Sequence, residues 1–217
     1  MKKNYEMDMC SGPILGKLLT FTIPLIFSGI LQLLFNAADV IVVGRFAGSQ
    51  SLAAVGSTTA LINLMINIFI GLSVGVNVIV ARYYGAKREK DVQDTIHTAM
   101  ALSIVSGLFL IIVGQLLSRP MLELMGTPDD VIDKSTIYMR IIFIGMPANM
   151  IYNFGSAILR AVGDTKRPLY FLTAAGVINV VLNLFFVIMF RMDVAGVALA
   201  TAISQAISAF LVILCLM

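Results

Sequence analysis

Long apolar runs separated by short clusters of charged residues dominate this sequence of 217 residues. A helix rises about 1.5 Å per residue, so about 20 mostly apolar residues are enough to cross the hydrocarbon core of a membrane. Hydrophobic residues make up 59% of the chain and charged residues 12%, whereas soluble domains carry about 45–50% and about 25%. We therefore predict an all-α, polytopic membrane protein, which excludes a soluble enzyme, a coiled coil and a nucleic-acid-binding domain. The six predicted spans cover residues 18–43, 52–80, 92–117, 135–159, 169–190 and 194–217.

The distribution of basic residues predicts the orientation, because cytoplasmic loops of membrane proteins carry an excess of Lys and Arg. Ten of the 15 basic residues fall on the side of the N-terminus, whereas the opposite side carries an acidic loop around Asp129 and Asp130. We therefore predict a multi-pass protein of the cytoplasmic membrane, with both the N-terminus and the end of the sixth span on the cytoplasmic side. The ten basic residues are Lys2, Lys3, Lys17, Arg82, Lys87, Arg88, Lys90, Arg160, Lys166 and Arg167.

The sequence offers no pattern typical of catalysis, metal binding or nucleotide hydrolysis. His97 is the single histidine, and the two cysteines, Cys10 and Cys215, lie near opposite ends, so their spacing does not suit a metal site. The chain carries neither a G-x-x-x-x-G-K phosphate loop nor a usable serine, histidine and acid arrangement. We predict that the protein is not an enzyme and has no metal site and no bound cofactor.

Asp39 is the only carboxylate well inside a predicted span. An ionised aspartate at the centre of a bilayer costs about 2.5–3.5 kcal/mol on insertion scales, so it needs a cavity, a partner or a proton. Gln32 and Asn36 stand seven and three residues before it, which places all three on one helix face. The alternative interpretation is that Asp39 lies close to Arg45 and only anchors the helix at the membrane surface.

Further spans carry polar residues at helical spacing, and such residues must face protein or water rather than lipid. One interpretation is packing between helices, helped by small residues such as Gly71, Gly75, Gly155 and Gly176. The other is a hydrated cavity with adaptable Met and Phe walls, which the sequence favours because several polar stripes occur together with one acid. The polar residues are Asn63, Asn67, Ser73, Asn77, Asn149, Asn153, Ser156, Asn179, Asn183, Thr201, Ser204, Gln205 and Ser208. The candidate walls are Met65, Phe69, Met146, Met150 and Phe154, and the alternative for each of them is a place in the core or facing lipid.

Several short stretches, in this order, carry a family resemblance over essentially the whole chain. They are residues 23–24 (IP) leading to 36–44 (NAADVIVVG), 71–75 (GLSVG) followed by 81–86 (ARYYGA), 159–168 (LRAVGDTKRP), and 179–183 followed by 195–201 (AGVALAT). Together they resemble the multidrug and toxic compound extrusion (MATE) family of transporters. The segment 159–168 is the most specific of these stretches.

The resemblance implies one lobe of a transporter with twelve helices in two six-helix lobes, with residues 1–217 forming the N-terminal lobe. It also implies export of lipophilic, often cationic drugs and toxic compounds in exchange for protons or sodium ions. By resemblance, Asp39 matches the carboxylate whose protonation or ion binding drives transport. Asn183 departs from the family, since some members have an aspartate there, which weakens a mechanism with two coupled carboxylates. Candidate cavity residues are Gln32, Asn36, Asn149, Asn153, Asn179, Asn183 and Thr201.

Two other functions stay open. A flippase for lipid-linked saccharides, from a related branch of the superfamily, would need cationic residues to hold a pyrophosphate, and the spans offer Arg140 alone. A non-transporting partner protein would instead bind a complete transporter. Because the sequence is still apolar at Met217, we expect a second lobe from a longer chain or a second copy. The expected partners are thus small-molecule drugs or toxins, membrane lipids and a second lobe, and no nucleic acid.

Overall fold

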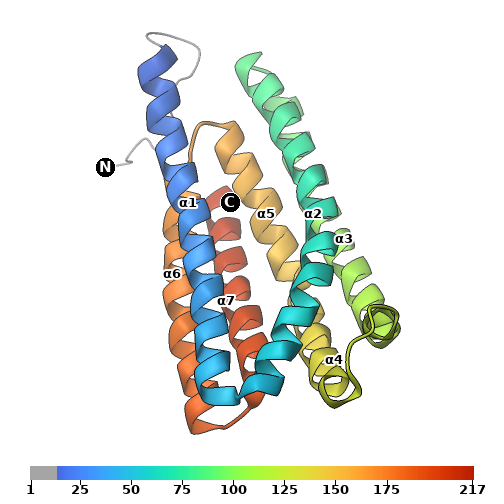
Figure 1. Ribbon diagram of the computed structural model, residues 1–217. Coiled ribbons are helices and arrows are strands. Elements are labelled where there is room, and N and C mark those ends of the chain that lie inside the picture. Colours follow the sequence, from blue (N-terminus) through green and yellow to red (C-terminus); the bar gives the residue numbers. More distant parts are fainter. Residues whose placement is uncertain (1–13) are drawn as a thin grey trace.

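The computed structural model describes residues 14–217, which form long helices joined by short turns (Figure 1). Five of these helices are long and apolar enough to cross a membrane, and a bent pair makes a sixth span if it is counted as one. The prediction of an all-α, multi-pass membrane protein is therefore confirmed. The elements are α1 (Ile14–Val42), η1 (Val43–Ala47), α2 (Ser49–Gly85), α3 (Glu89–Leu124), α4 (Asp129–Ile144), α5 (Met146–Ala161), α6 (Lys166–Leu184), η2 (Phe185–Met189) and α7 (Asp193–Leu216).

The predicted span 135–159 is a pair of helices rather than one, because α4 and α5 meet at Gly145 with a bend of 48°. Pro147 stands in the first turn of α5. Its ring nitrogen has no hydrogen to donate, so the helical hydrogen-bond pattern cannot run unbroken through this point. The other predicted spans lie, to within one residue, inside a helix or a helix with its π-helical continuation. Lys2, Lys3 and Cys10 lie outside the described residues.

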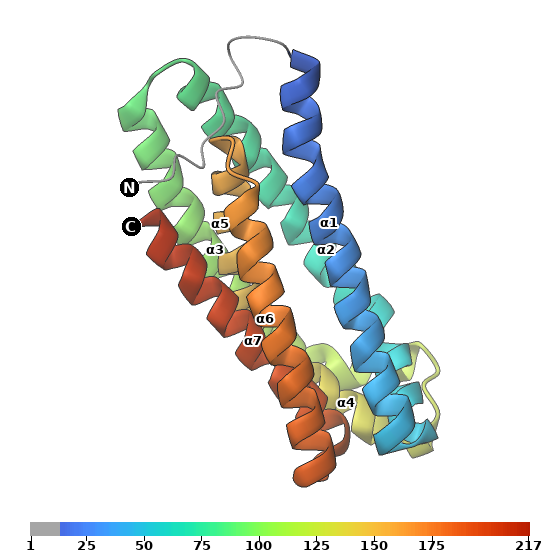
Figure 2. The same cartoon turned by 90° about the vertical axis from the view of Figure 1, so that its left-hand side faces the viewer.

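The helices pack as a chain of neighbours rather than around one axis (Figures 1 and 2). α1 packs chiefly on α6, α6 packs on α7, and α7 packs on α5. α5 in turn contacts α2 and α3, while α4 contacts α2, α3 and α7. As a result α1 stands at the edge of the bundle, with most of its apolar side chains exposed. The two π-helical segments, η1 and η2, contact each other at the end of α1 and α6.

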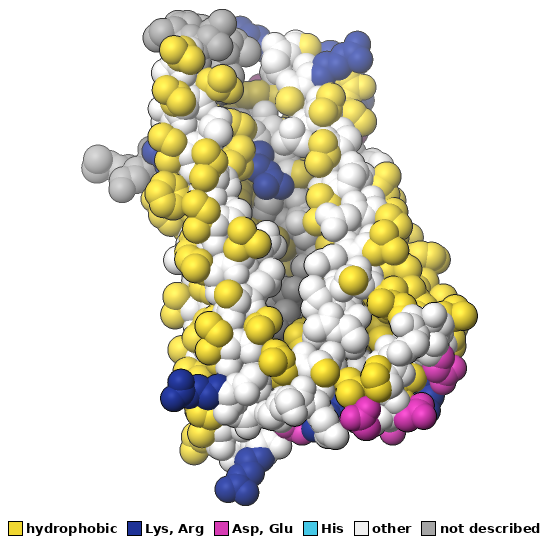
Figure 3. All heavy atoms as spheres, in the orientation of Figure 1, with side chains coloured by type: hydrophobic (Ala, Val, Ile, Leu, Met, Phe, Trp, Pro, Cys, Tyr) yellow, Lys and Arg dark blue, Asp and Glu magenta, His cyan; other side chains and the backbone are white. Residues whose placement is uncertain are grey.

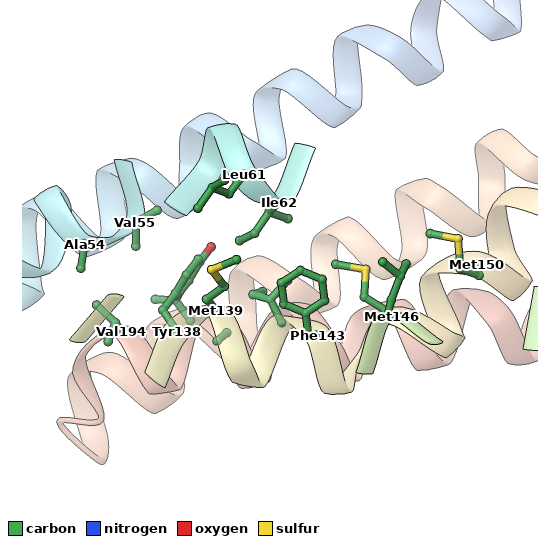
Figure 4. Close-up of a cluster of buried hydrophobic side chains, with 14 of the residues drawn as sticks. Ala54, Val55, Leu61, Ile62, Tyr138, Met139, Phe143, Met146, Met150 and Val194 are labelled. Carbon is green, nitrogen blue, oxygen red and sulfur yellow. The ribbon is translucent and has the colours of Figure 1, made fainter. Parts of the chain in front are cut away.

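A cluster of buried apolar side chains forms the core between α2, α4 and α5 (Figure 4). Phe143, Met146 and Met150 are fully buried there, as is Phe154. The interpretation of Met146, Met150 and Phe154 as cavity walls is therefore wrong, and the alternative, a place in the packed core, is confirmed. These side chains point into a helix interface, because the apolar stripe of α5 faces its neighbours and only its polar stripe faces open space. Met65 and Phe69 are half-buried and pack against the same core.

Close contacts between helices occur where glycine leaves room for a neighbour. A Cβ atom at Gly107 of α3 would lie 2.4 Å from the Pro147 Cα atom of α5, and one at Gly176 of α6 would lie 1.9 Å from the Phe35 Cε2 atom of α1. Such small residues let helices approach closely in a membrane protein. The predicted role in close packing holds for Gly176, whereas no described atom lies within 4 Å of a Cβ atom at Gly71 and no close contact is made there among residues 14–217.

Gly155 and Gly75 repeat this contrast. A Cβ atom at Gly155 would lie 2.1 Å from the Val212 Cγ1 atom of α7, whereas nothing lies within 4 Å of one at Gly75. Close approach at glycine therefore concerns α3, α5, α6 and α7, and the glycines in the second half of α2 serve no such contact among the described residues.

Candidate functional site

A chain of polar side chains connects α1, α6 and α7. The Asn183 Nδ2 group of α6 donates hydrogen bonds to the Asp39 carboxylate of α1 and, over 3.2 Å, to the Asn179 Oδ1 atom. The Asn179 Nδ2 group donates to the Thr201 Oγ1 atom of α7 over 3.2 Å. The Thr201 hydroxyl donates to the Val197 carbonyl oxygen over 3.0 Å. Asp39 is thus connected through two amides to a third helix.

The spacing on α6 explains how this chain forms. Asn179 and Asn183 are one helical turn apart, so their side chains lie on the same face of α6 and reach each other. Both are buried, and the Asn183 Oδ1 atom accepts no hydrogen bond within the described part of the chain. Asp39 takes its hydrogen bond from Asn183 and forms no ion pair with Arg45, whose side chain is exposed. The interpretation of Asp39 as a surface anchor is therefore not supported by the contacts.

A small cavity of about 110 Å³, here called the polar cavity, adjoins this chain. Its walls come from α1, α5, α6 and α7, and Asp39 is the only charged residue among those that line it. Asn183 lies behind the wall and reaches the cavity only through its contacts with Asp39 and Asn179. The structure thus brings together, in one lining, the predicted residues Gln32, Asn36, Asp39, Asn149, Asn153, Asn179 and Thr201.

A larger groove of about 470 Å³, here called the Arg160 groove, lies between α1, α2, α5 and α6. It shares Gln32, Tyr152 and Asn153 with the polar cavity, so the two spaces are adjacent. Arg160 is the only charged residue that lines the groove. Figure 3 shows the hollow between the two halves of the molecule, with a basic side chain inside it.

The sequence does not single out Arg160 as a site residue, because it stands next to a turn rich in basic residues and counts among the basic residues of that side. The structure places it inside α5, which ends at Ala161. A signal was present in the spacing, since Asn153, Ser156 and Arg160 continue one polar stripe at intervals of three and four residues.

Not every polar stripe reaches a cavity. Asn63 and Asn67 on α2 are exposed, and Asn67 donates a hydrogen bond only to the Asn63 carbonyl oxygen over 2.7 Å. Further along the same helix, Ser73 and Asn77 do line the Arg160 groove. Arg140 on α4 is exposed and lines none of the described cavities. Within residues 14–217, no group of His, Cys, Asp and Glu side chains could hold a metal ion.

The fold and the site define a class: a multi-pass, all-helical membrane protein with one half-buried carboxylate in a polar cavity. The family follows from comparison with known proteins. The MatE family model matches residues 24–185, and the chain belongs to this family. MatE proteins are transporters and do not form a class of enzymes.

The relatives are about twice as long as this chain. It is 35% identical to the probable multidrug resistance protein YoeA of Bacillus subtilis, over 89% of this chain and 42% of the relative. It is 28% identical to the FAD transporter of Shewanella oneidensis, over 90% of this chain and 44% of the relative. Among solved structures, an outward-facing multidrug resistance MATE transporter matches with a TM-score of 0.87 and 26% identity, over 93% of this chain and 44% of that one. The chain thus spans less than half the length of these proteins.

Proposed function

We propose that this chain is the N-terminal lobe of a cation-coupled antiporter that exports lipophilic, often cationic compounds across the cytoplasmic membrane. The observation that carries the proposal is the position of Asp39, the sole charge lining a polar cavity between four helices. The name of YoeA, a probable multidrug resistance protein, supports the same activity.

Competition for one carboxylate would couple the two fluxes. An ionised Asp39 accepts the hydrogen bond from Asn183 and attracts a cationic substrate, because a buried charge needs a partner. A proton or sodium ion bound at Asp39 removes that attraction, so the substrate leaves. Since α1 packs chiefly on α6, a change at the contact between Asp39 and Asn183 acts on the main support of α1. Two positions of α1 would then have different affinities for cation and substrate, as alternating access requires.

The coupling ion is either a proton or a sodium ion in this proposal, and no other cofactor takes part. Asp39 accepts a hydrogen bond from the neutral Asn183 amide, and no second acid lines the polar cavity. A single carboxylate suffices for exchange of one proton, while a sodium ion would also need the neutral oxygens. Imposing a pH gradient and a sodium gradient separately on proteoliposomes distinguishes the two ions.

The orientation and the second lobe also belong to the proposal. Basic residues are more numerous at the end where α2 meets α3 and α5 meets α6 than at the opposite end, where Figure 3 shows acidic and basic side chains together at the bottom. This distribution favours a cytoplasmic N-terminus. The exposed flank of α1 and the open side of the Arg160 groove are surfaces that a second six-helix lobe would cover, enclosing a path for the substrate.

Asp39→Asn tests the coupling role, because the amide cannot be ionised but nearly preserves the side-chain shape. We expect the variant, in the complete native protein, to lose ethidium efflux from loaded cells while its membrane expression stays normal. Asp130→Asn is the matched control, since Asp130 is exposed in the first turn of α4 and lines neither the polar cavity nor the Arg160 groove. Undiminished efflux in Asp39→Asn would overturn the proposed coupling.

A further inference from the structure

The Arg160 groove carries a positive charge that no described carboxylate neutralises. The Arg160 guanidinium forms no ion pair with any described residue, and no acidic side chain lines the groove. Arginine is seldom left buried without a partner, because removing its charge from water is costly. Here the side chain is only partly exposed and faces the groove.

A second polar side chain of the groove lies one helical turn away. Ser156 lines the same groove, and its buried Oγ atom lies beside the Tyr152 hydroxyl. The neighbouring polar groups are already used: the Tyr152 hydroxyl donates to the Pro168 carbonyl oxygen over 3.2 Å, and the Asn77 amide donates to the Ala157 carbonyl oxygen over 2.7 Å. Arg160 is therefore the one charged donor that lines the groove, and the spacing of four residues brings Ser156 beside it on α5.

We propose that the Arg160 groove binds the anionic group of an amphiphilic substrate, a phosphate or a carboxylate, through Arg160 and Ser156. A guanidinium presents several donors to such a group, and a hydroxyl adds one more. The apolar part of the substrate would lie against the groove residues Phe21, Leu25 and Ile70. Substrates would thus include organic anions and zwitterions as well as cations. This inference rests on the proposed transport function for the use of the site, but its test measures binding alone.

The two neighbouring spaces then differ in the charge that they select. Asp39 is the only charged lining residue of the polar cavity, and Arg160 is the only one of the groove. A zwitterionic substrate could contact both, since Gln32 and Asn153 border both spaces. Loss of either charge should therefore affect one class of ligand and spare the other.

Binding of 4-methylumbelliferyl phosphate tests the proposal, with uncharged 4-methylumbelliferone and cationic ethidium as comparison probes. The complete native transporter is reconstituted in phosphatidylcholine nanodiscs, and affinities are measured by fluorescence anisotropy or equilibrium dialysis. We expect Arg160→Gln to weaken binding of the phosphate at least tenfold and to change ethidium binding less than twofold. Arg160→Lys, which keeps the charge, should recover part of the affinity. Arg140→Gln is the matched control, because it removes an exposed arginine that lines neither space.

Equal phosphate affinity in wild type and Arg160→Gln would overturn the proposal, as would equal wild-type affinities for the phosphate and the uncharged probe. If Arg160→Gln does not fold, Ser156→Ala and Arg160→Lys give the same comparison with smaller changes, and unchanged phosphate affinity in both contradicts the site. If Asp39→Asn loses ethidium efflux and the wild type does not bind the phosphate probe, the transport proposal is supported and the anion site in the Arg160 groove is contradicted.

A further arm distinguishes a soluble anion from a lipid headgroup as the source of the anionic group. The phosphate probe is measured again in nanodiscs that contain phosphatidylglycerol. Competition that disappears in Arg160→Gln assigns the site to the lipid headgroup, and unchanged binding assigns it to soluble substrates. Weaker binding that is identical in wild type and Arg160→Gln indicates general charge repulsion by the lipid and contradicts a specific site.

Discussion

The core between α2, α4 and α5 and the polar chain between α1, α6 and α7 are held together by different forces. In the core, fully buried side chains such as Phe143 and Met150 fill the space between helices, and Gly107 lets α3 touch the backbone of α5. In the polar chain, hydrogen bonds from Asn183 and Asn179 connect three helices beside a cavity. Side chains fill the core completely, whereas the polar chain borders a cavity that can hold water or a ligand.

The difference matters because lipid is as apolar as the core. Helices in a membrane gain little from hiding apolar surface, so close packing and hydrogen bonds decide which contacts last. A filled interface has one good arrangement, whereas hydrogen bonds beside a cavity can be exchanged for water or ligand. The α2–α5 side is therefore the rigid part of the lobe, and α1 with its polar contacts is the part suited to move.

The largest effect is expected for Gly107→Ala. The new Cβ atom would lie 2.4 Å from the Pro147 Cα atom, and a backbone atom cannot rotate away. Overpacking of this kind costs about 1–3 kcal/mol and occasionally more, and we expect the upper end. Thermal unfolding of the protein in detergent measures the loss. Gly71→Ala is the control, because nothing lies within 4 Å of its Cβ position, and equal losses in both variants would contradict the packing argument.

A smaller loss is expected for Phe143→Ala. In soluble proteins this truncation costs about 3–5 kcal/mol. Part of that value reflects transfer from water, which is reduced when the unfolded reference lies in lipid. The cavity remains, so we expect about 2 kcal/mol of destabilisation. Phe210→Ala, at a position that is 59% exposed, should cost far less in the same unfolding assay. A similar cost at both positions would show that the core is not well packed.

The smallest effect on stability is expected for Thr201→Val, which keeps the shape but removes the acceptor for Asn179. Side-chain hydrogen bonds between membrane helices contribute about 0.6 kcal/mol on average. Transport should nevertheless fall about tenfold or more, because the chain that positions Asn183 against Asp39 is broken. Unfolding and ethidium efflux are measured on the same variant. Normal efflux combined with a large loss of stability would contradict this prediction, because it would show that the polar chain supports the fold rather than transport.

Hydropathy and spacing predict the fold well here for a physical reason. Backbone groups in lipid must be hydrogen-bonded within the chain, so an apolar run of sufficient length becomes a helix. The common face of Asn179 and Asn183, and the inclusion of Gln32 and Asp39 in one cavity, follow from helical periodicity in the same way. The coupling of transport to an ion at Asp39 does not follow from these contacts and stays a prediction.

Features that depend on contacts between helices could not be read from one sequence. The break at Gly145 arises from the combination of Pro147 with close packing against α3 and α7. The spacing of Met146 and Met150 is the same whether they line a cavity or fill a core. Only the helices that pack against α5 determine which of the two occurs. For Arg160 the sequence predicts a solvated position in a basic turn, because charge near the end of a span ordinarily faces water, whereas the side chain lines a groove.

The positions of the two charged residues along the bundle expose the lobe to the membrane voltage. Asp39 lies near the end of α1, whereas Arg160 lies near the end of α5, at the side where α1 begins. Moving one elementary charge across the full potential is worth about 2.3 kcal/mol per 100 mV. An ion at Asp39 and an anion at Arg160 would each cross a different fraction of that potential. Voltage would then bias the occupancy of the two spaces unequally, even at fixed concentrations on both sides of the membrane.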